Sequence, residues 1–93
     1  MDNLDISVTI YSPESVIYKG KVKAITSVND KGKFDILAFH SNFISIVKDY
    51  LILHEPQGSE KVFKLKQGVL RLVNNQLSIF LGLEGLTSSS GVE

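Results

Sequence analysis

Apolar and polar residues alternate along most of the chain, which is the pattern of strands with one buried face. In DISVTIY, residues 5–11, the apolar side chains of Ile6, Val8 and Ile10 alternate with hydroxyl side chains. The same two-residue period returns in several short runs, and no long segment has the period of a helix. The pattern therefore predicts a chain built from short strands.

The run VIYKGKVKAITSV, residues 16–28, alternates in the same way and predicts a further strand. Lys19, Lys21 and Lys23 fall on one face of it. The opposite face then carries Val22, Ala24, Thr26 and Val28. Gly20, inside the run, predicts a bulge or a close approach to the backbone. The lysine row could attract an acidic partner, although a solvated strand face explains it more simply.

Clusters of turn-forming residues separate the alternating runs. They are YSPES at residues 11–15, NDKG at 29–32, PQGS at 56–59 and the pair Asn74-Asn75. Regular turns between short runs predict an all-β fold, a sandwich or barrel of about eight to ten short, mainly antiparallel strands. HSNFISIV, at residues 40–47, is ambiguous because a short apolar run fits either a helix or a strand.

The chain has 93 residues, which is enough for one small domain. We expect a sandwich domain over residues 1–86 and a flexible polar tail, TSSSGVE, over residues 87–93. No apolar run reaches the length that crosses a bilayer, and the N-terminus lacks the regions of a signal peptide. These features predict a soluble intracellular domain.

Ten basic and ten acidic residues give a formal net charge of zero. Nucleic-acid-binding proteins normally carry a basic surplus, so this class is disfavoured. A neutral chain also argues against strong electrostatic steering toward a partner. The absence of cysteine excludes disulfides, thiolate zinc sites and cysteine nucleophiles.

His40 lies in GKFDILAFHSNFIS, residues 32–45, where it could be a catalytic base, a metal ligand, a core residue or a partner contact. The other histidine, His54, is distant in sequence, and no spacing supplies the further ligands that a metal site needs. A hydrolase using His40 with Ser41 or Ser45 lacks the G-x-S-x-G elbow. The glycines form no phosphate-binding loop. The residues alone therefore predict no catalytic, cofactor or metal site, only a β scaffold that binds something.

Three stretches, taken in order, resemble the motifs of a known family. They are ISVTIYSPESVIYKGKVKAI at residues 6–25, GKFDILAFHSNFIS at 32–45 and FKLKQGVLRLVNNQLSIFLG at 63–82. Together they resemble the N-terminal domain of the epsilon subunit of F-type ATP synthase, called delta in mitochondria, over about residues 4–84. Their order and spacing carry the resemblance, because no single motif is diagnostic.

The resemblance implies a flattened β-sandwich in the rotary central stalk of F1Fo ATP synthase. Such a subunit packs against the gamma subunit and rests on the membrane c-ring. It couples the two during proton- or sodium-driven ATP synthesis, without an active site or a cofactor. It would lie peripherally on the cytoplasmic face of the inner or plasma membrane, in a heteromeric complex and without inserting into the bilayer. The alternative is a free-standing β-sandwich that binds a protein or a ligand.

The resemblance also implies where the partners bind. His40 matches the family histidine at the gamma-facing surface, and we expect its neighbours Phe39 and Phe43 to join it there. We expect Phe39, Phe43 and Leu83 to form an exposed apolar patch. The loop that approaches the c-ring in the family matches Asn29, Asp30, Lys31, Gly32 and Lys33.

Two departures from the family pattern change these expectations. Ala38 stands where the family usually has proline, so the loop before His40 should be less rigid. The family usually continues into a pair of C-terminal helices, whereas LEGLTSSSGVE has no helical period. We therefore expect a naturally short or a truncated subunit with no inhibitory C-terminal arm and no ATP binding.

Overall fold

The computed structural model describes residues 5–82, which form seven β-strands and no helix. The strands are β1 (Ile6–Tyr11), β2 (Val16–Val22), β3 (Ala24–Asn29), β4 (Gly32–Leu37), β5 (Phe43–His54), β6 (Glu60–Val73) and β7 (Gln76–Leu81). In this part of the chain, no helix is long and apolar enough to cross a membrane. The predicted tail and the domain boundary at residue 86 lie outside the described residues.

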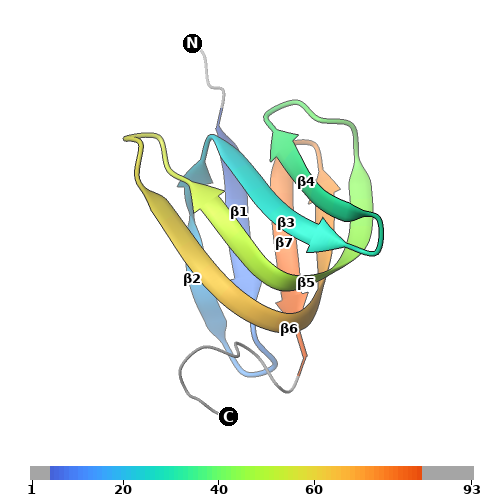
Figure 1. Ribbon diagram of the computed structural model, residues 1–93. Coiled ribbons are helices and arrows are strands. Elements are labelled where there is room, and N and C mark those ends of the chain that lie inside the picture. The colour runs from blue at the N-terminus through green and yellow to red at the C-terminus, as the bar shows by residue number, and fades with distance from the viewer. Residues whose placement is uncertain (1–4, 83–93) are drawn as a thin grey trace.

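The strands form one sheet that folds over itself into two packed layers (Figure 1). Their order is β2-β1-β7-β6-β5-β3-β4. β1 and β7 pair in parallel, and the other strand pairs of residues 5–82 are antiparallel. The predicted all-β sandwich with mainly antiparallel strands is therefore confirmed.

Two long strands, β5 and β6, belong to both layers. They have 12 and 14 residues, and their pairing shifts register between Lys48 and Asp49. Asp49 has a φ of 71°, so the backbone leaves the regular strand geometry at this bend. We call one layer the β1 layer; it contains β2, β1, β7, residues 68–73 of β6 and residues 43–47 of β5. The other, the β3 layer, contains β4, β3 and the remaining halves of β5 and β6. Polar residues at the bend, such as Lys48 and Asp49, resemble a turn in the sequence. The sequence therefore predicts more and shorter strands than the seven of residues 5–82.

The core lies between the two layers and is made of aliphatic side chains. Inward positions alternate along each strand, as the pattern of residues 5–11 predicts. The buried apolar residues are Ile6, Val8, Ile10, Val22, Ile25, Ile36, Val47, Leu51, Leu53, Leu65, Leu70, Leu72, Leu77, Ile79 and Leu81. A fully buried side chain of this size contributes about 1.5–3 kcal/mol of transfer free energy. Both layers supply residues to the set, so neither layer has a core without the other.

The run 16–28 is not one strand, and this prediction was wrong. The strand breaks at Lys23, where the chain leaves the β1 layer and enters the β3 layer. Val22 is buried before the break and Ile25 after it, so the buried apolar positions change from even to odd numbers. Lys23 pairs with Asp5 at 3.0 Å across the crossing.

The turns predicted from composition are confirmed. Asn74 and Asn75 have φ values of 51° and 66°, the left-handed conformation of a two-residue hairpin turn. The β3–β4 hairpin closes between Asn29 and Gly32, whose φ of 119° is open to glycine and strained for other residues. Ser12 closes the β1–β2 turn, because its backbone N–H donates to the Ser15 carbonyl oxygen at 2.8 Å.

Tyr18 and Phe63 close the side of the sandwich between β2 and β6, with their ring centroids 5.8 Å apart. The Tyr18 ring lies over Gly20, where a Cβ atom would be only 2.7 Å from the phenol oxygen. Gly20 therefore allows a close approach, one of the two roles expected for it. The pairing of β1 with β2 shifts register between Ile10 and Tyr11, and Ile17 is the extra residue on β2, so the bulge of this strand lies at Ile17 and not at Gly20.

Gly68 tests how tightly β6 and β7 pack. A Cβ atom there would be 3.2 Å from the Phe80 carbonyl oxygen and 3.2 Å from a Leu81 methyl carbon. We expect Gly68→Ala to lower the free energy of unfolding by about 1–3 kcal/mol through overpacking, measured by urea denaturation. Gln67→Ala, at the exposed neighbouring position, should change it by less than about 0.5 kcal/mol. Equal stability of the two variants would contradict this packing.

Tyr18 should titrate later than an ordinary tyrosine. Burial raises its pKa above 10.0, and the charge of Glu55 and the hydrogen bond from the phenol to that carboxylate raise it further. Since the folded-state pKa lies above the unfolded-state value, this stabilisation is present below about pH 10 and is lost as the pH rises toward the folded-state pKa. We expect the tyrosinate absorbance of the folded protein to show a late component that Tyr18→Phe removes. If the late component remains in the Tyr18→Phe variant, the late titration belongs to another tyrosine.

Candidate functional site

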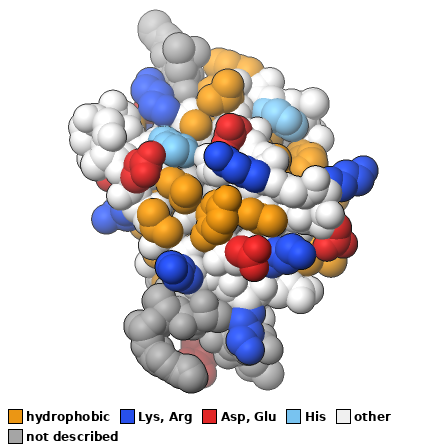
Figure 2. Space-filling view, viewed as in Figure 1, with side chains coloured by type: hydrophobic (Ala, Val, Ile, Leu, Met, Phe, Trp, Pro, Cys, Tyr) orange, Lys and Arg blue, Asp and Glu red, His pale blue; other side chains and the backbone are white. Residues whose placement is uncertain are grey.

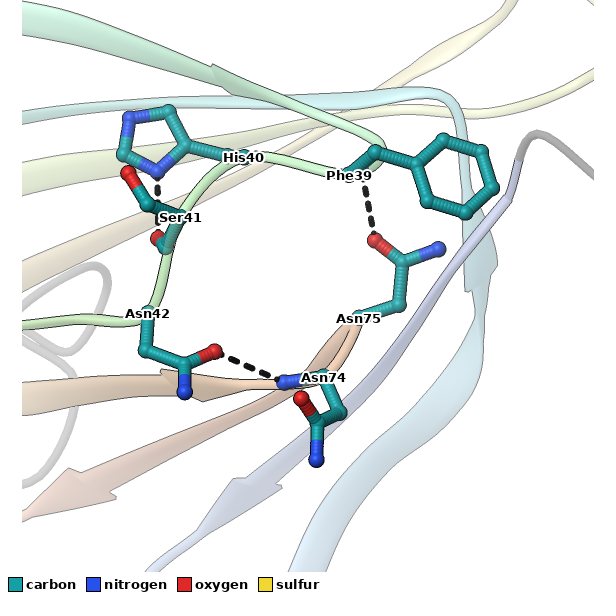
Figure 3. Close-up of a pocket in the computed structure, with 6 residues that line it drawn as sticks. All are labelled: Phe39, His40, Ser41, Asn42, Asn74 and Asn75. Carbon is teal, nitrogen blue, oxygen red and sulfur yellow. Dashed lines mark hydrogen bonds between the residues drawn. The ribbon is translucent and has the colours of Figure 1, made fainter.

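Two loops meet at one end of the sandwich and hold each other through asparagine side chains (Figure 3). The β4–β5 loop contains Phe39 and Asn42, and the β6–β7 turn contains Asn74 and Asn75. The Phe39 backbone N–H donates to Asn75 Oδ1 at 2.7 Å. In the other direction, the Asn74 backbone N–H donates to Asn42 Oδ1 at 3.0 Å. Each loop therefore satisfies a backbone donor of the other.

Asn75 also ties this end of the molecule to the start of β1. Its side-chain amide donates to the Asp5 carbonyl oxygen at 3.3 Å, and its own carbonyl oxygen accepts the Ser7 N–H at 3.1 Å. One residue thus joins the β6–β7 turn, the β4–β5 loop and β1. The left-handed φ of Asn75, which asparagine tolerates, directs these groups toward their partners.

Phe39 is held in an exposed and strained position. Its φ is 66°, which costs a residue other than glycine about 1–3 kcal/mol. The residue is nevertheless 71% exposed, so burial of the ring does not compensate this cost. The bond to Asn75 stabilises the loop, and so does the bond from the His40 N–H to the Leu37 carbonyl oxygen at 3.2 Å. An exposed aromatic ring on a constrained loop is suited to contact a partner.

His40 is exposed and lies outside the core, so it is not a core residue. Its Nδ1 lies 2.7 Å from the Ser41 carbonyl oxygen, so Nδ1 must carry a proton and donate it. In the neutral ring, Nε2 is then an acceptor available to a donor on a partner. The ring also meets Phe43 edge-on, with the centroids 5.7 Å apart.

A hollow of about 520 Å³ lies between the two loops. It is lined by Phe39, His40, Ser41, Asn42, Asn74 and Asn75. The amide oxygens of Asn42 and Asn75 already accept backbone hydrogen bonds within the site. Few converging polar groups remain for a small ligand, so the hollow better fits a protruding group of a protein surface.

The predicted c-ring loop is the β3–β4 turn, and its conformation is fixed by Asn29. Asn29 Oδ1 accepts the Lys31 N–H at 2.9 Å, and its amide nitrogen donates to Ser45 Oγ at 3.2 Å. Asp30 and Lys31 are exposed at the tip, with Asp30 4.0 Å from the Lys48 ammonium. The turn therefore presents both charges to solvent on a backbone that is tied to β5.

Phe43 connects the two predicted contact regions. Its ring is half-buried against the core and meets Phe34 edge-on at 5.6 Å and His40 at 5.7 Å. A second hollow, of about 350 Å³, is lined by the β3–β4 turn and the first residues of β5, from Phe43 to Ile46. Leu83 lies outside the described residues.

A row of exposed apolar side chains, which was not predicted from the sequence, crosses the β1 layer. Pairing places Ile46 beside Val69, Val69 beside Phe80, Phe80 beside Tyr11, and Tyr11 beside Val16. We call these five residues the apolar row. Ile46, Phe80 and Val16 are 58%, 44% and 51% exposed, and Phe80 stacks on Tyr11 at 5.1 Å. Each strand contributes only one residue, so the row appears only when the register of all five strands is known.

The outer face of the β3 layer carries a polar cluster instead. Thr26 Oγ1 donates to Asp35 Oδ1 at 2.6 Å and lies 2.8 Å from His54 Nε2. His54 Nδ1 lies 3.2 Å from Glu60 Oε2. The order resembles a hydroxyl–histidine–carboxylate triad, but Thr26 gives its proton to Asp35, so His54 does not receive it. Figure 2 shows this face as a mixture of apolar and charged side chains of both signs.

The contacts of His40 do not match hydrolase chemistry either. The ring bonds to the Ser41 carbonyl oxygen, and Ser45 Oγ donates to the Ile46 carbonyl oxygen at 3.2 Å. Neither hydroxyl group is bonded to the imidazole, as a nucleophile with its base would be. Within residues 5–82, no three His, Asp or Glu side chains are placed to hold a metal ion.

Known relatives of the chain are subunits of one enzyme. The ATP synthase epsilon chain of a Nitratiruptor species is 31% identical over 94 residues, covering 96% of this chain and 71% of the relative. The epsilon chain of a Clostridium botulinum strain is 29% identical over 72 residues, covering 76% of this chain. The match covers 54% of that relative, so the chain spans about half its length.

Solved structures share the fold. A chain of the Euglena gracilis mitochondrial ATP synthase, solved as OSCP/F1/c-ring in rotational state 1, superposes with a TM-score of 0.82 at 17% identity. That match covers 96% of this chain and 57% of the other. A chain of the central stalk/c-ring of the Tetrahymena thermophila mitochondrial ATP synthase gives 0.70 at 14% identity, covering 100% and 77%.

The family assignment comes from a match to a family model. The model for the β-sandwich domain of the ATP synthase delta/epsilon chain matches residues 5–81, from the residue before β1 to the last residue of β7. This range contains both loops of the candidate site and the apolar row. The chain therefore belongs to the ATP synthase delta/epsilon chain family and carries that family's β-sandwich domain.

Proposed function

We propose that this protein is a non-catalytic subunit of the ATP synthase central stalk, where it couples the gamma subunit to the membrane c-ring during proton- or sodium-driven ATP synthesis. Family membership supports the proposal, because the epsilon chain is a subunit of the synthase without a catalytic role of its own. The fold also occurs in central-stalk and c-ring assemblies. In such a complex, the chain would be membrane-associated on the cytoplasmic face of the inner or plasma membrane.

The observation that carries the gamma contact is the apolar row. Soluble monomers rarely leave aligned apolar side chains exposed across a whole sheet, and such surfaces mark contacts with other proteins. The row begins at Ile46 on β5, which lines the same hollow as Phe43, and it continues across the β1 layer to Val16. We therefore place gamma on the apolar row together with Phe39, His40 and Phe43.

We place the c-ring contact on the β3–β4 turn, Asn29 to Lys33. Its exposed charges suit the polar loops of a membrane ring, and the bonds of Asn29 hold the tip in one conformation. The turn and Ile46 line the same hollow, so the proposed gamma and c-ring contacts adjoin. A single rigid body would then touch both partners.

Rigidity follows from the way the layers share their core. A slip of one residue in any strand would turn its buried side chains toward solvent. β5 and β6 run through both layers, so one layer cannot slide over the other without disturbing their pairing. The domain is therefore suited to turn as one body with its partners.

The gamma contact can be tested with two exposed residues on opposite faces. Ile46 in the apolar row is 58% exposed, and Val62 on the β3 layer is 55% exposed. We expect Ile46→Thr to weaken binding to the purified gamma subunit from the same source about tenfold, since roughly 1–2 kcal/mol of apolar burial is lost. Threonine retains the branched shape that suits a strand.

Val62→Thr is the matched control and should bind gamma as the unchanged protein does. Binding is measured by calorimetry, with circular dichroism confirming the fold of each variant. His40→Ala is expected to weaken the complex as well. If the Ile46→Thr and His40→Ala variants both bind gamma with full affinity, gamma does not bind at this surface.

The order of the β4–β5 loop should depend on Asn75. Asn75→Gly preserves the left-handed backbone but removes two side-chain hydrogen bonds. We therefore expect the free energy of unfolding to fall by about 1–3 kcal/mol. The Phe39 amide should then exchange its hydrogen faster, as NMR can measure. Asn74→Gly is the control, because the Asn74 contact uses its backbone N–H, which glycine retains. Equal exchange at Phe39 in both variants would argue against the asparagine link.

A further inference from the structure

A band of cations lies beside the apolar row on the same face of the β1 layer. Pairing places Lys19 beside Thr9, Thr9 beside Ser78, and Ser78 beside Arg71. Lys21 lies at the next outward position of β2, beside Ser7. Lys19, Lys21 and Arg71 are exposed. We call Lys19, Lys21 and Arg71, with the hydroxyl groups of Thr9 and Ser78 between them, the cationic band.

Carboxylates are missing from the middle of this face. From Ser7 to Tyr11, Val16 to Lys21, Ile44 to Ile46, Val69 to Val73 and Gln76 to Phe80, the described strands carry no Asp or Glu. Three of the described acids stand at its margins. Asp5 is paired with Lys23 at 3.0 Å, and Glu14 lies in the β1–β2 turn. Asp30 lies in the β3–β4 turn, where it faces Lys48 of β5. Among the described residues, the middle of this face therefore carries three positive charges and no negative one, although the formal net charge of the whole chain is zero.

The spacing of the two features follows from sheet geometry. Alternate residues of a strand are about 7 Å apart, so the cationic band runs about 7 Å from the apolar row. Lys19 and Arg71 are separated by three strand spacings, about 14 Å. A partner that covers the apolar row necessarily brings its flank over the cations, and a flank without compensating charge would leave them desolvated and unpaired.

We propose that the partner docked on this face presents carboxylates beside an apolar strip, with the carboxylates opposite Lys19, Lys21 and Arg71. The inference rests on the proposed docking face and adds its chemistry: the partner is a protein surface that is acidic along one side. The hydroxyl groups of Thr9 and Ser78 supply further donors to those carboxylates.

The composition of the face favours a protein over an anionic bilayer or a nucleic acid. Lipid-binding polybasic segments gather about 4–8 Lys and Arg residues, and nucleic-acid sites need a larger basic surplus still. Three cations beside aligned apolar side chains instead match a protein interface, with an apolar centre and a charged rim. Rim charges of this kind act mainly on the association rate and its salt dependence.

The test compares two triple variants that remove the same charge. One is Lys19→Gln/Lys21→Gln/Arg71→Gln. The control is Lys61→Gln/Lys64→Gln/Lys66→Gln, three exposed lysines of β6 that are not on this face. Association with the gamma subunit from the same source is followed by surface plasmon resonance at 0.05 M and 0.5 M salt, and denaturation curves confirm that each variant folds.

We expect the first variant to associate about tenfold more slowly at low salt and to lose most of its salt dependence. The control should behave as the unchanged protein does. If both variants bind gamma equally fast at both salt concentrations, the acidic flank is disproved while the docking face stands.

Two other outcomes also overturn the inference. If the unchanged protein does not bind gamma at either salt concentration, the proposed gamma contact fails together with the inference. If the first variant, unlike the control, loses binding to phosphatidylserine vesicles or loses a dimer seen by gel filtration, the face serves a membrane or a second copy. Neither of those occupants is the acidic protein surface proposed here.

Discussion

The bend shared by β5 and β6 is the constraint on which the rest of this structure depends. A sheet of short strands with one apolar face must bury that face, and here the sheet does so by folding onto itself at Lys48 and Asp49. The aliphatic residues of both layers then form one core. The same bend brings the β3–β4 turn against the first residues of β5, so the proposed contact regions are a consequence of how the core closes.

Closing the core inward leaves two outer faces that differ in chemistry. The β3 layer is held together outside by Thr26, Asp35, His54 and Glu60, which satisfy one another across four strands. The β1 layer has no comparable cluster among its described residues, and it leaves Ile46, Phe80 and their neighbours exposed. Polar groups that are already paired offer little to a partner, whereas exposed apolar side chains gain free energy when they are covered. The two faces are therefore not equivalent as binding surfaces.

Local patterns predicted much of the fold, because alternation and turn chemistry act within a few residues. DISVTIY specified the inward side of β1, and Asn74-Asn75 specified a hairpin. The break at Lys23 was not predictable from period alone, since an alternating run carries no mark of which layer it belongs to. The sequence singled out His40, and a family resemblance implied its partner-facing role. The left-handed conformation of Phe39 beside it was not predictable, because its support comes from Asn75, distant in sequence. The apolar row depends on the parallel pairing of β1 with β7, a contact between the two ends of the described chain.

Net charge shows the same limit of sequence reasoning. A sum of zero suggests a surface without electrostatic preference, yet charges act over about 10 Å at 0.1 M salt, a distance shorter than this molecule. A partner therefore responds to the face that it approaches. Lys19, Lys21 and Arg71 come from two strands that are not neighbours, and the order of the sheet places them on one face. Topology thus separates charges that the composition shows as balanced, and in doing so it gives one side of a neutral domain a preference for an acidic neighbour.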